Sequence, residues 1–154
     1  SEVNLDELVR NVIAMQSISL GKKNTTVEIQ GSLPIVRCDR TRIQEVFQSL
    51  ISNAVKYSDR QENKIEIGFM TDHPARLGET VFYVRDHGIG IQKKYLETIF
   101  NMFKRLHPKD AYGGGTGSGL AIAGKIISQH GGEIWAESEG EGQGATLYFT
   151  IPQR

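Results

Sequence analysis

Apolar side chains recur at helical spacing in three long stretches of the chain, and each stretch predicts an amphipathic helix. The first helix begins after Asn4, which together with Glu7 has the form of a capping box, and Gly21 is expected to end it. The second begins near Asp39, a residue that can cap a helix. The third runs over about residues 118–129 and is expected to stop at His130-Gly131-Gly132. Each helix can bury one apolar face against another layer of the fold.

Between these helices, shorter stretches alternate apolar and polar residues, which is the pattern of a β-strand with one buried face. On this pattern we expect strands over 25–30 and 64–70. The apolar run that ends at Val84 predicts a further strand over 81–84, and we also expect strands over 133–137 and 145–151 and a short extended piece over 35–38. A shorter helix is predicted over 92–103, whereas 104–117 shows no periodicity. Because strands and helices alternate irregularly, the sequence predicts an α+β fold, a two-layer α/β sandwich with a mixed sheet.

Composition and charge exclude several classes of protein. The 154 residues predict one domain, and the 18 basic and 18 acidic residues give no reason to expect a nucleic acid or an anionic membrane as a partner. A single cysteine, Cys38, excludes an internal disulfide and fits a reducing, cytoplasmic compartment. No apolar run reaches about 18 residues, the length of a membrane span, although a longer parent protein can still be attached to a membrane.

The second helix carries a group of polar residues beside its apolar stripe. At helical spacing, Ser49, Asn53 and Lys56 lie along one flank, and Tyr57 lies at the edge. An asparagine there costs free energy unless its amide is paired, and its carbonyl oxygen is a hard ligand suited to Mg²⁺. Lys56 can meet a phosphate, and Tyr57 can stack on a base. The alternative is a surface Asn and Lys with Tyr57 packed in the core, and this helix alone leaves both open.

The strand at 81–84 leads into the sequence Asp86-His87-Gly88-Ile89-Gly90-Ile91. A carboxylate at a strand end can accept a hydrogen bond from an exocyclic amine such as that of adenine, and glycines let the backbone approach a ligand closely. The alternative is a simple Asp–Gly turn. Taken alone, this motif does not decide between them.

A glycine-rich run, 113–120, feeds directly into the third helix. Backbone amides at a helix N-terminus form an anion site, so this run predicts phosphate binding. The neighbouring span 119–126 nearly matches a P-loop, but Ile126 replaces the Ser/Thr and the Gly–Lys pair lies inside a helix. No dinucleotide-binding glycine motif follows a strand either. Basic residues over 104–109 can clamp a triphosphate or simply form a solvated loop.

The motifs occur in a specific order: Asn53 to Tyr57, then Asp86-x-Gly88-x-Gly90, then Phe100-x-x-Phe103, then Gly115 to Leu120, and finally Gly144-Ala145-Thr146. In this order they resemble the catalytic, ATP-binding domain of sensor histidine kinases, within the ATPase superfamily that includes gyrase, Hsp90 and MutL. The resemblance covers nearly the whole chain, and residues 99–107 are similar to phytochrome-like bacterial sensor kinases. It implies a Bergerat-type ATP-binding fold, with the sheet covered on one face by three helices.

The resemblance also implies a role for each motif. Asp86 accepts the adenine amine and selects ATP over GTP, Asn53 coordinates Mg²⁺, and Lys56 contacts phosphate. A lid over about 98–117 is anchored by its phenylalanines, and Arg105 or Lys104 steadies the γ-phosphate. The other implied nucleotide-binding residues are Tyr57, Gly88, Gly90, Ile91, Phe103, Thr116, Gly117, Ser118, Gly119, Leu120 and Thr146, the last of them in a water network beside the adenine.

Three departures from the family pattern matter. One turn before Asn53 the family usually carries Asn or a carboxylate, and Ser49 stands there, where a shorter hydroxyl can weaken metal binding or proton acceptance. His87 stands where Asn or Thr is common, and it brings a titratable ring beside the site. None of the 4 histidines has a Glu or Asp neighbour on a helical face, so the phosphoacceptor and dimerisation helices are expected elsewhere in a homodimeric parent.

The sequence therefore predicts a monomeric domain that binds ATP with Mg²⁺ and transfers the γ-phosphate to a histidine on a separate dimerisation domain. Ser49, Asn53, Lys56 and Arg105 are the expected catalytic residues, and a response regulator is the expected downstream partner. Two alternatives stay open. Ser49 motivates a regulatory nucleotide-binding module without phosphotransfer, and the superfamily also includes gyrase- or Hsp90-like ATPases, although the glutamate that activates water in those proteins is absent at position 49.

Overall fold

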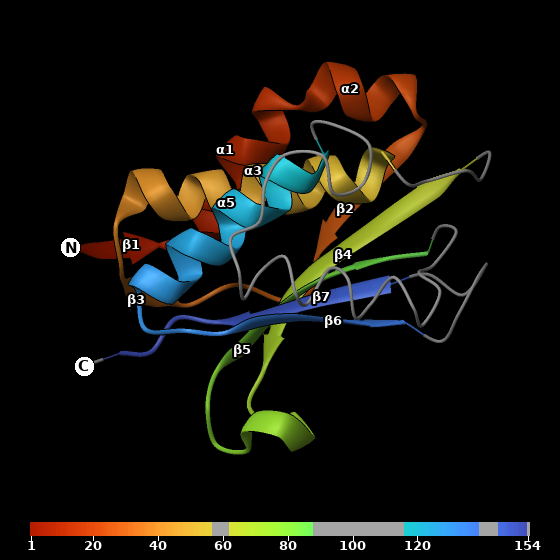
Figure 1. The fold of residues 1–154 in the computed structure, drawn as a ribbon. Helices are drawn as coiled ribbons and strands as arrows, with labels where there is room; N and C mark the ends of the chain where they lie inside the picture. Colours follow the sequence, from red (N-terminus) through yellow and green to blue (C-terminus); the bar gives the residue numbers. More distant parts are fainter. Residues whose placement is uncertain (57–61, 88–115, 139–144, 154) are drawn as a thin grey trace.

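The fold is built on one mixed five-stranded sheet, and the long helices that the structure describes lie on one face of that sheet (Figure 1). The computed structural model describes residues 1–56, 62–87, 116–138 and 145–153. The strands of the sheet are β2 Thr25–Ile29, β4 Asn63–Met70, β5 Val81–Asp86, β6 Ile134–Ser138 and β7 Ala145–Thr150. Their order is β2-β4-β5-β7-β6, with β2 parallel to β4 and every other pair antiparallel. The predicted mixed sheet is confirmed.

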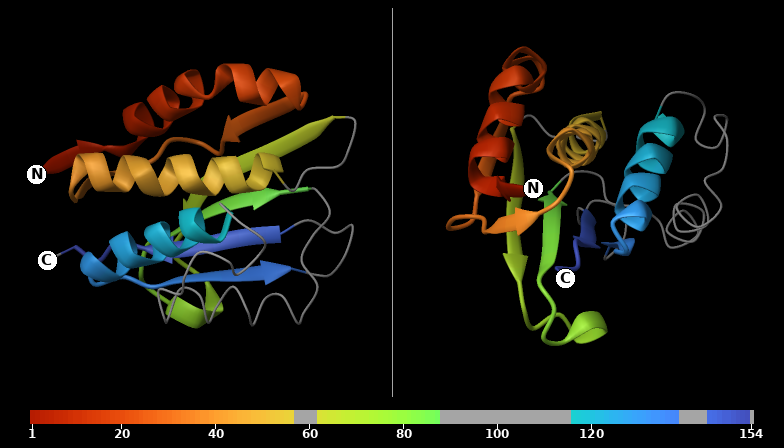
Figure 2. Two further views of the ribbon diagram at one scale, coloured as in Figure 1. Left: turned by 45° about the horizontal axis from the view of Figure 1, so that its top comes forward. Right: turned by 90° about the vertical axis from the view of Figure 1, so that its left-hand side faces the viewer.

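The helices cover what we call the inner face of the sheet, and the opposite side is the outer face (Figure 2). They are α1 Leu5–Met15, α2 Ser17–Lys22, α3 Arg40–Lys56 and α5 Thr116–Gln129. The predicted first helix is broken at Gln16 into α1 and α2, so the prediction of three helices over one face is confirmed with this division. A separate antiparallel pair is formed by β1 Glu2–Asn4, which precedes α1, and β3 Ile35–Arg37, which precedes α3.

Local signals set most helix ends. The Asn4 side chain accepts the Glu7 backbone N–H at 3.2 Å, and the Asp39 carboxylate accepts that of Arg42 at 3.2 Å. The expected stop at Gly21 is wrong: α2 continues to Lys22, and Asn24 takes a left-handed φ of 48° two residues beyond it. An asparagine tolerates this conformation and can end a helix as glycine does.

The end of α5 also follows the sequence. Gly131 has a φ of 78°, and its N–H donates to the Ser128 carbonyl at 2.9 Å. The next N–H, from Gly132, donates to the Ile127 carbonyl at 2.9 Å. These two bonds form a Schellman motif, which satisfies carbonyls that a helix end leaves unpaired. The helix therefore stops at the predicted glycine pair, whereas its start at Thr116 precedes the expected Ser118.

The main core lies between the helices and the inner face. Phe149 of β7 packs edge-on against Phe47 of α3 at 5.4 Å and stacks on Phe82 of β5 at 5.4 Å. Ile65 and Ile67 of β4 are fully buried in the same core. In β4 these inward residues alternate with Lys64 and Glu66, which is the pattern that predicted this strand.

The outer face carries a second, smaller cluster of Tyr83, Tyr148, Trp135, Val81 and Met70. The segment between β4 and β5 folds over it and includes the short helix η1 Pro74–Arg76. His73 lies in this loop just before η1 and is buried: its ring lies 4.6 Å from that of Tyr148 and 5.3 Å from that of Trp135. The Nδ1 atom of His73 accepts the Ala75 N–H at 3.0 Å, and Nε2 lies 2.9 Å from Glu137 Oε2. Both ring nitrogens of His73 thus have partners, one of which caps the start of η1.

Candidate functional site

The C-terminal half of α3 presents Asn53 at the border of the helix core. Its side chain is half-buried, and its Oδ1 atom is buried and accepts no hydrogen bond in the part of the chain that the structure describes. Buried polar atoms are normally paired, so this oxygen lacks the partner that its burial demands. Ser49, one helical turn earlier, is also half-buried. Ser49 and Asn53 of the predicted flank therefore both lie at the border of the core, whereas the side chain of Lys56 is outside the described part of the chain.

Asp86 is the last residue of β5, at the end of the sheet. Val84, two residues earlier, is buried in the main core, so alternation directs Asp86 to the inner face as well. Its cross-strand partners are Ile65 of β4 and Ala145 of β7. The half-buried carboxylate thus lies on the side of the sheet that the helices cover.

The glycine-rich run ends in the first turn of α5, which begins at Thr116. The first backbone N–H groups of a helix have no intrahelical partner, and the helix dipole adds partial positive charge there. The views in Figures 1 and 2 agree that the start of α5, the end of α3 and the end of β5 lie at the same end of the molecule. The helices α3 and α5 also pack against each other. The elements that bear three of the predicted motifs therefore end or begin at the same end of the fold.

The structure separates Thr146 from Asp86, against expectation. Thr146 pairs with Arg85, and its hydroxyl accepts a hydrogen bond from Arg85 Nε at 3.3 Å. Directly opposed residues of an antiparallel pair share a face, so Thr146 lies on the outer face while Asp86 lies on the inner one. A water network that joins Thr146 to an adenine held by Asp86 does not fit this register. Ala145 is the cross-strand partner of Asp86, so it is Ala145 that shares the inner face with that carboxylate.

Sequence reasoning missed a polar pair beside the site. His87 Nε2 lies 2.8 Å from Glu66 Oε1, and Gln30 Nε2 donates to the other oxygen of Glu66 at 2.8 Å. The hydrogen bond with His87 is the main cause that lowers the pKa of the Glu66 carboxyl below its usual range, and burial opposes it. Alternation could have placed these side chains on one face, but it could not supply the register between the strands.

Other predicted residues lie outside the described part of the chain: Tyr57, Gly88, Gly90, Ile91, Phe100, Phe103, Lys104 and Arg105. The same is true of the predicted helix over 92–103 and of nearly all of the predicted lid. The last lid residues, Thr116 and Gly117, belong to α5, as do Ser118, Gly119 and Leu120, and Lys56 is the last residue of α3.

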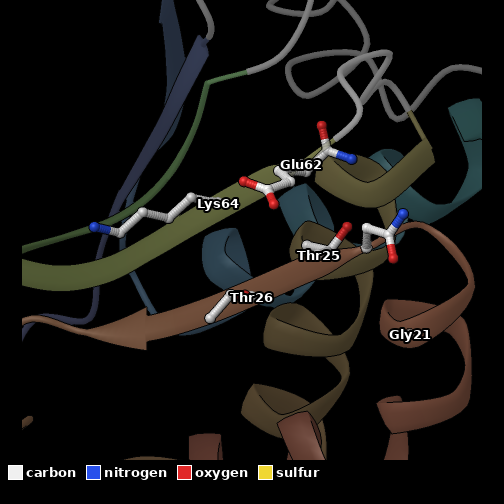
Figure 3. Close-up of a pocket in the computed structure, with 7 residues that line it drawn as sticks. Gly21, Thr25, Thr26, Glu62 and Lys64 are labelled. Carbon is white, nitrogen blue, oxygen red and sulfur yellow. The ribbon is translucent and has the colours of Figure 1, made fainter.

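A surface pocket opens where α2 turns into β2, next to the start of β4 (Figure 3). Its lining includes Glu62, Lys64 and Asn63. Asn63 has a structural role there, because its Nδ2 donates to the Lys23 carbonyl at 2.7 Å and its N–H to the Asn24 carbonyl at 3.0 Å. None of the predicted site residues that the structure describes lines this pocket.

No group of three His, Cys, Asp or Glu side chains that could hold a metal occurs among the described residues. Among the described residues, the buried Asn53 Oδ1 atom is the group of the predicted site that could bind a metal. Within the same part of the chain, no helix combines the length and the apolar character needed to cross a membrane.

Residues 38–154 match the family model of histidine kinase-, DNA gyrase B- and HSP90-like ATPases. The chain belongs to this family. Cyanobacterial phytochrome B of Nostoc sp. strain PCC 7120 is 47% identical over 150 residues, which are 97% of this chain and 19% of that protein. The chain thus spans about a fifth of the length of the curated relatives it matches.

Solved structures agree with the fold. The nucleotide-free catalytic domain of the histidine kinase ThkA has a TM-score of 0.76 and 29% identity, covering 99% of this chain and 95% of that one. ThkA in complex with the response regulator protein TrrA matches with a TM-score of 0.74 and 28% identity, covering 100% of this chain and 42% of that one. The chain is therefore a histidine-kinase-like ATPase catalytic domain, and the resemblance and the fold expected from its motifs are confirmed.

Proposed function

We propose that this domain binds ATP together with Mg²⁺ and transfers the γ-phosphate to a histidine on a separate dimerisation domain of a longer sensor kinase. One observation carries the proposal. The end of β5, the end of α3 and the N-terminus of α5 lie at the same end of the molecule. Asp86 ends β5 on the inner face, and Asn53 near the end of α3 has a buried oxygen with no partner among the described residues. Base, metal and phosphate each have a chemically suitable partner there.

Asp86 would read the base. Its carboxylate only accepts hydrogen bonds, and the exocyclic amine of adenine donates one. Guanine presents a carbonyl oxygen at the same position, so two acceptors would face each other and both would lose their water. Ala145 would line the adenine site from β7, because it shares the inner face with Asp86. Gly88, Gly90 and Ile91, which follow Asp86 in the sequence, would complete that side of the pocket.

The α3 flank and the start of α5 would hold the phosphates. Asn53 Oδ1 is a hard, buried and unpaired oxygen, which fits Mg²⁺ with phosphate oxygens and water as its remaining ligands. When bound, Mg²⁺ neutralises phosphate charge and orients the phosphates for transfer. Backbone amides from Thr116 to Leu120 would receive the phosphate oxygens at the helix N-terminus. Lys56 and Arg105 would add positive charge.

The acceptor and the partners lie in other parts of the parent protein under this proposal. Phosphoryl transfer depends mainly on positioning and charge stabilisation, so the domain has only to present the γ-phosphate to an external imidazole. The complex of ThkA with a response regulator, and the 47% identity to a cyanobacterial phytochrome, support a sensor kinase with a response regulator as its partner. We expect this parent kinase to be a homodimer.

Two variants and one transfer assay test the proposal. Asp86→Ala should weaken ATP binding by about 1.5–3 kcal/mol, the range for a hydrogen bond to a charged group. Asn53→Ala should remove the part of the affinity that depends on Mg²⁺. Radiolabelled phosphate should pass from ATP to a supplied dimerisation domain with an intact histidine, and not to one with that histidine replaced by alanine.

Ser49 supports a second candidate, a nucleotide-binding regulatory module that has lost phosphotransfer. Its hydroxyl is half-buried one turn before Asn53, where the family usually has a longer polar side chain. Nucleotide binding without any labelled acceptor would favour this candidate. Ser49→Asn would then be expected to restore transfer.

A further inference from the structure

Both sequence neighbours of Asp86 are tied to the outer face of the sheet. Arg85 Nε donates to Thr146 Oγ1 at 3.3 Å, and its guanidinium lies 4.8 Å from the centre of the Tyr83 ring. On the other side, His87 Nε2 lies 2.8 Å from Glu66 Oε1. Because consecutive residues of a strand point to opposite faces, two ties on the outer face direct the residue between them to the inner face.

The tie through Glu66 is itself anchored to a second strand. Gln30, which follows β2, donates from Nε2 to Glu66 Oε2 at 2.8 Å and to Glu28 Oε1 at 3.0 Å. The Glu66 side chain is only 18% exposed, whereas that of His87 is 49% exposed. One carboxylate oxygen is therefore fixed by Gln30, and the other is presented to His87. An acceptor held in this way loses little further side-chain entropy when it binds the imidazole.

The position of His87 makes this bond important for Asp86. Among the described residues, the paired register of β5 ends at Asp86, and His87 lies just beyond this last pair. The next residue in the sequence is Gly88, whose missing Cβ permits a wide range of backbone angles. The Glu66–His87 hydrogen bond thus holds the chain between Asp86, the last paired residue, and Gly88, whose backbone angles are little restricted.

We propose that His87 and Glu66 are positioning residues for adenine recognition, which hold the backbone after Asp86 so that its carboxylate keeps its direction toward the base. This role rests on the proposed function of Asp86. The pair does not touch the nucleotide and acts through Asp86. Without the pair, the Asp86 carboxylate is still present but its orientation varies. ATP binding must then order it, and this entropy loss weakens the affinity.

Calorimetric titration of ATP into five forms of this chain tests the role: wild type, His87→Ala, Glu66→Ala, Asp86→Ala and the double variant Glu66→Ala/Asp86→Ala. The two single alanine variants of the pair should each weaken ATP binding by about three- to tenfold, the scale of one net hydrogen bond. Adding Glu66→Ala to Asp86→Ala should cause no further loss, because the Glu66–His87 bond acts through the carboxylate. Glu66→Gln keeps an oxygen that can accept the imidazole N–H, and it should recover most of the affinity.

The chain provides a matched control on the same face. His73 and Glu137 form a second pair with an Nε2–Oε2 distance of 2.9 Å, packed in the aromatic cluster rather than beside Asp86. Glu137→Ala should leave ATP affinity within about twofold of wild type, since it removes a comparable bond at another place. Urea unfolding of each variant verifies that the protein titrated is folded.

Three results would overturn the positioning role: folded Glu66→Ala and His87→Ala variants that bind ATP as wild type does, a loss that persists in the Asp86→Ala background, or an equal loss in Glu137→Ala. Failure of the proposed function has a different signature. If Asp86→Ala itself binds ATP as tightly as wild type, the adenine assignment fails and the positioning role fails with it.

Discussion

The two faces of the sheet differ in what they contribute. The inner face packs aromatic and branched side chains against the helices, with Phe149 in contact with both Phe47 and Phe82. The outer face combines stacked rings, such as Trp135 on Tyr148 at 5.5 Å, with hydrogen-bonded charged groups. Asp86 belongs to the inner face, but its neighbours are held on the outer one. If Asp86 binds the base as proposed, alternation along β5 lets one face present the binding group while the ties on the other face hold its orientation.

The largest expected effect concerns the packing of the inner face. Phe82→Ala removes a ring that is 1% exposed and contacts Phe149, so it should lower the free energy of unfolding by about 3–5 kcal/mol. Chemical denaturation monitored by circular dichroism measures this. Phe82→Leu, which keeps most of the apolar volume, should cost much less. Equal losses for the two variants would contradict the account of the inner face as a close-packed core.

On the outer face, packing is tested at Gly68. A Cβ atom added there would lie 2.5 Å from Tyr83 Oη and 2.7 Å from its Cζ, so the ring must move. Gly68→Ala should therefore destabilise the fold by about 1–3 kcal/mol, the usual cost of overpacking. Gly21→Ala is the control, because nothing lies within 4 Å of its added Cβ inside α2. That control should be neutral or stabilising by up to about 1 kcal/mol, and a similar loss in both would refute the steric explanation.

The assignment of faces at β7 is tested by two neighbouring substitutions. Ala145→Leu adds bulk beside Asp86 on the inner face and should weaken ATP binding by about tenfold or more. Thr146→Val acts on the outer face, where it removes only the hydroxyl that Arg85 contacts, and should have a smaller effect on ATP. Calorimetric titration compares the two. If Thr146→Val proves the more damaging, the register drawn for this edge of the site is wrong.

The smallest predicted effect is a pH dependence of stability. The bond from His87 lowers the pKa of the Glu66 carboxyl below its ordinary value near 4.5, which means that the folded state favours the ionised form. This stabilisation is fully present above about pH 4.5 and is lost as the pH falls through the lower, folded-state pKa. The difference in unfolding free energy between wild type and Glu66→Gln should therefore shrink on acidification. Urea titrations from neutral to acid pH measure it, and a difference that stays constant would exclude the mechanism.

Features that depend on a few consecutive residues could be predicted from the sequence. The caps at Asn4 and Asp39 and the stop at Gly131 are local, and the structure has all three. Asp86 at a strand end followed from the apolar run before it. The three-residue strand β1 was too short to give a periodic pattern, and α2 passed through Gly21 because Asn24 could take the left-handed turn instead.

Features that depend on register could not be predicted. The difference between Ala145 and Thr146 is one residue, which is enough to exchange the two faces of the sheet. The Glu66–His87 bond joins residues 21 positions apart, and burial of His73 requires the aromatic cluster to which four strands contribute. Composition and local pattern carry no information on such pairings.

The most direct test of the central claim is a calorimetric titration of this chain with ATP and then with GTP, each with and without Mg²⁺. If Asp86 reads the adenine amine and Asn53 holds the metal, ATP will bind, GTP will not, and Mg²⁺ will strengthen the binding of ATP. Equal affinity for the two nucleotides, or no binding of either, would contradict the claim that the inner-face end of the sheet is an adenine-specific site.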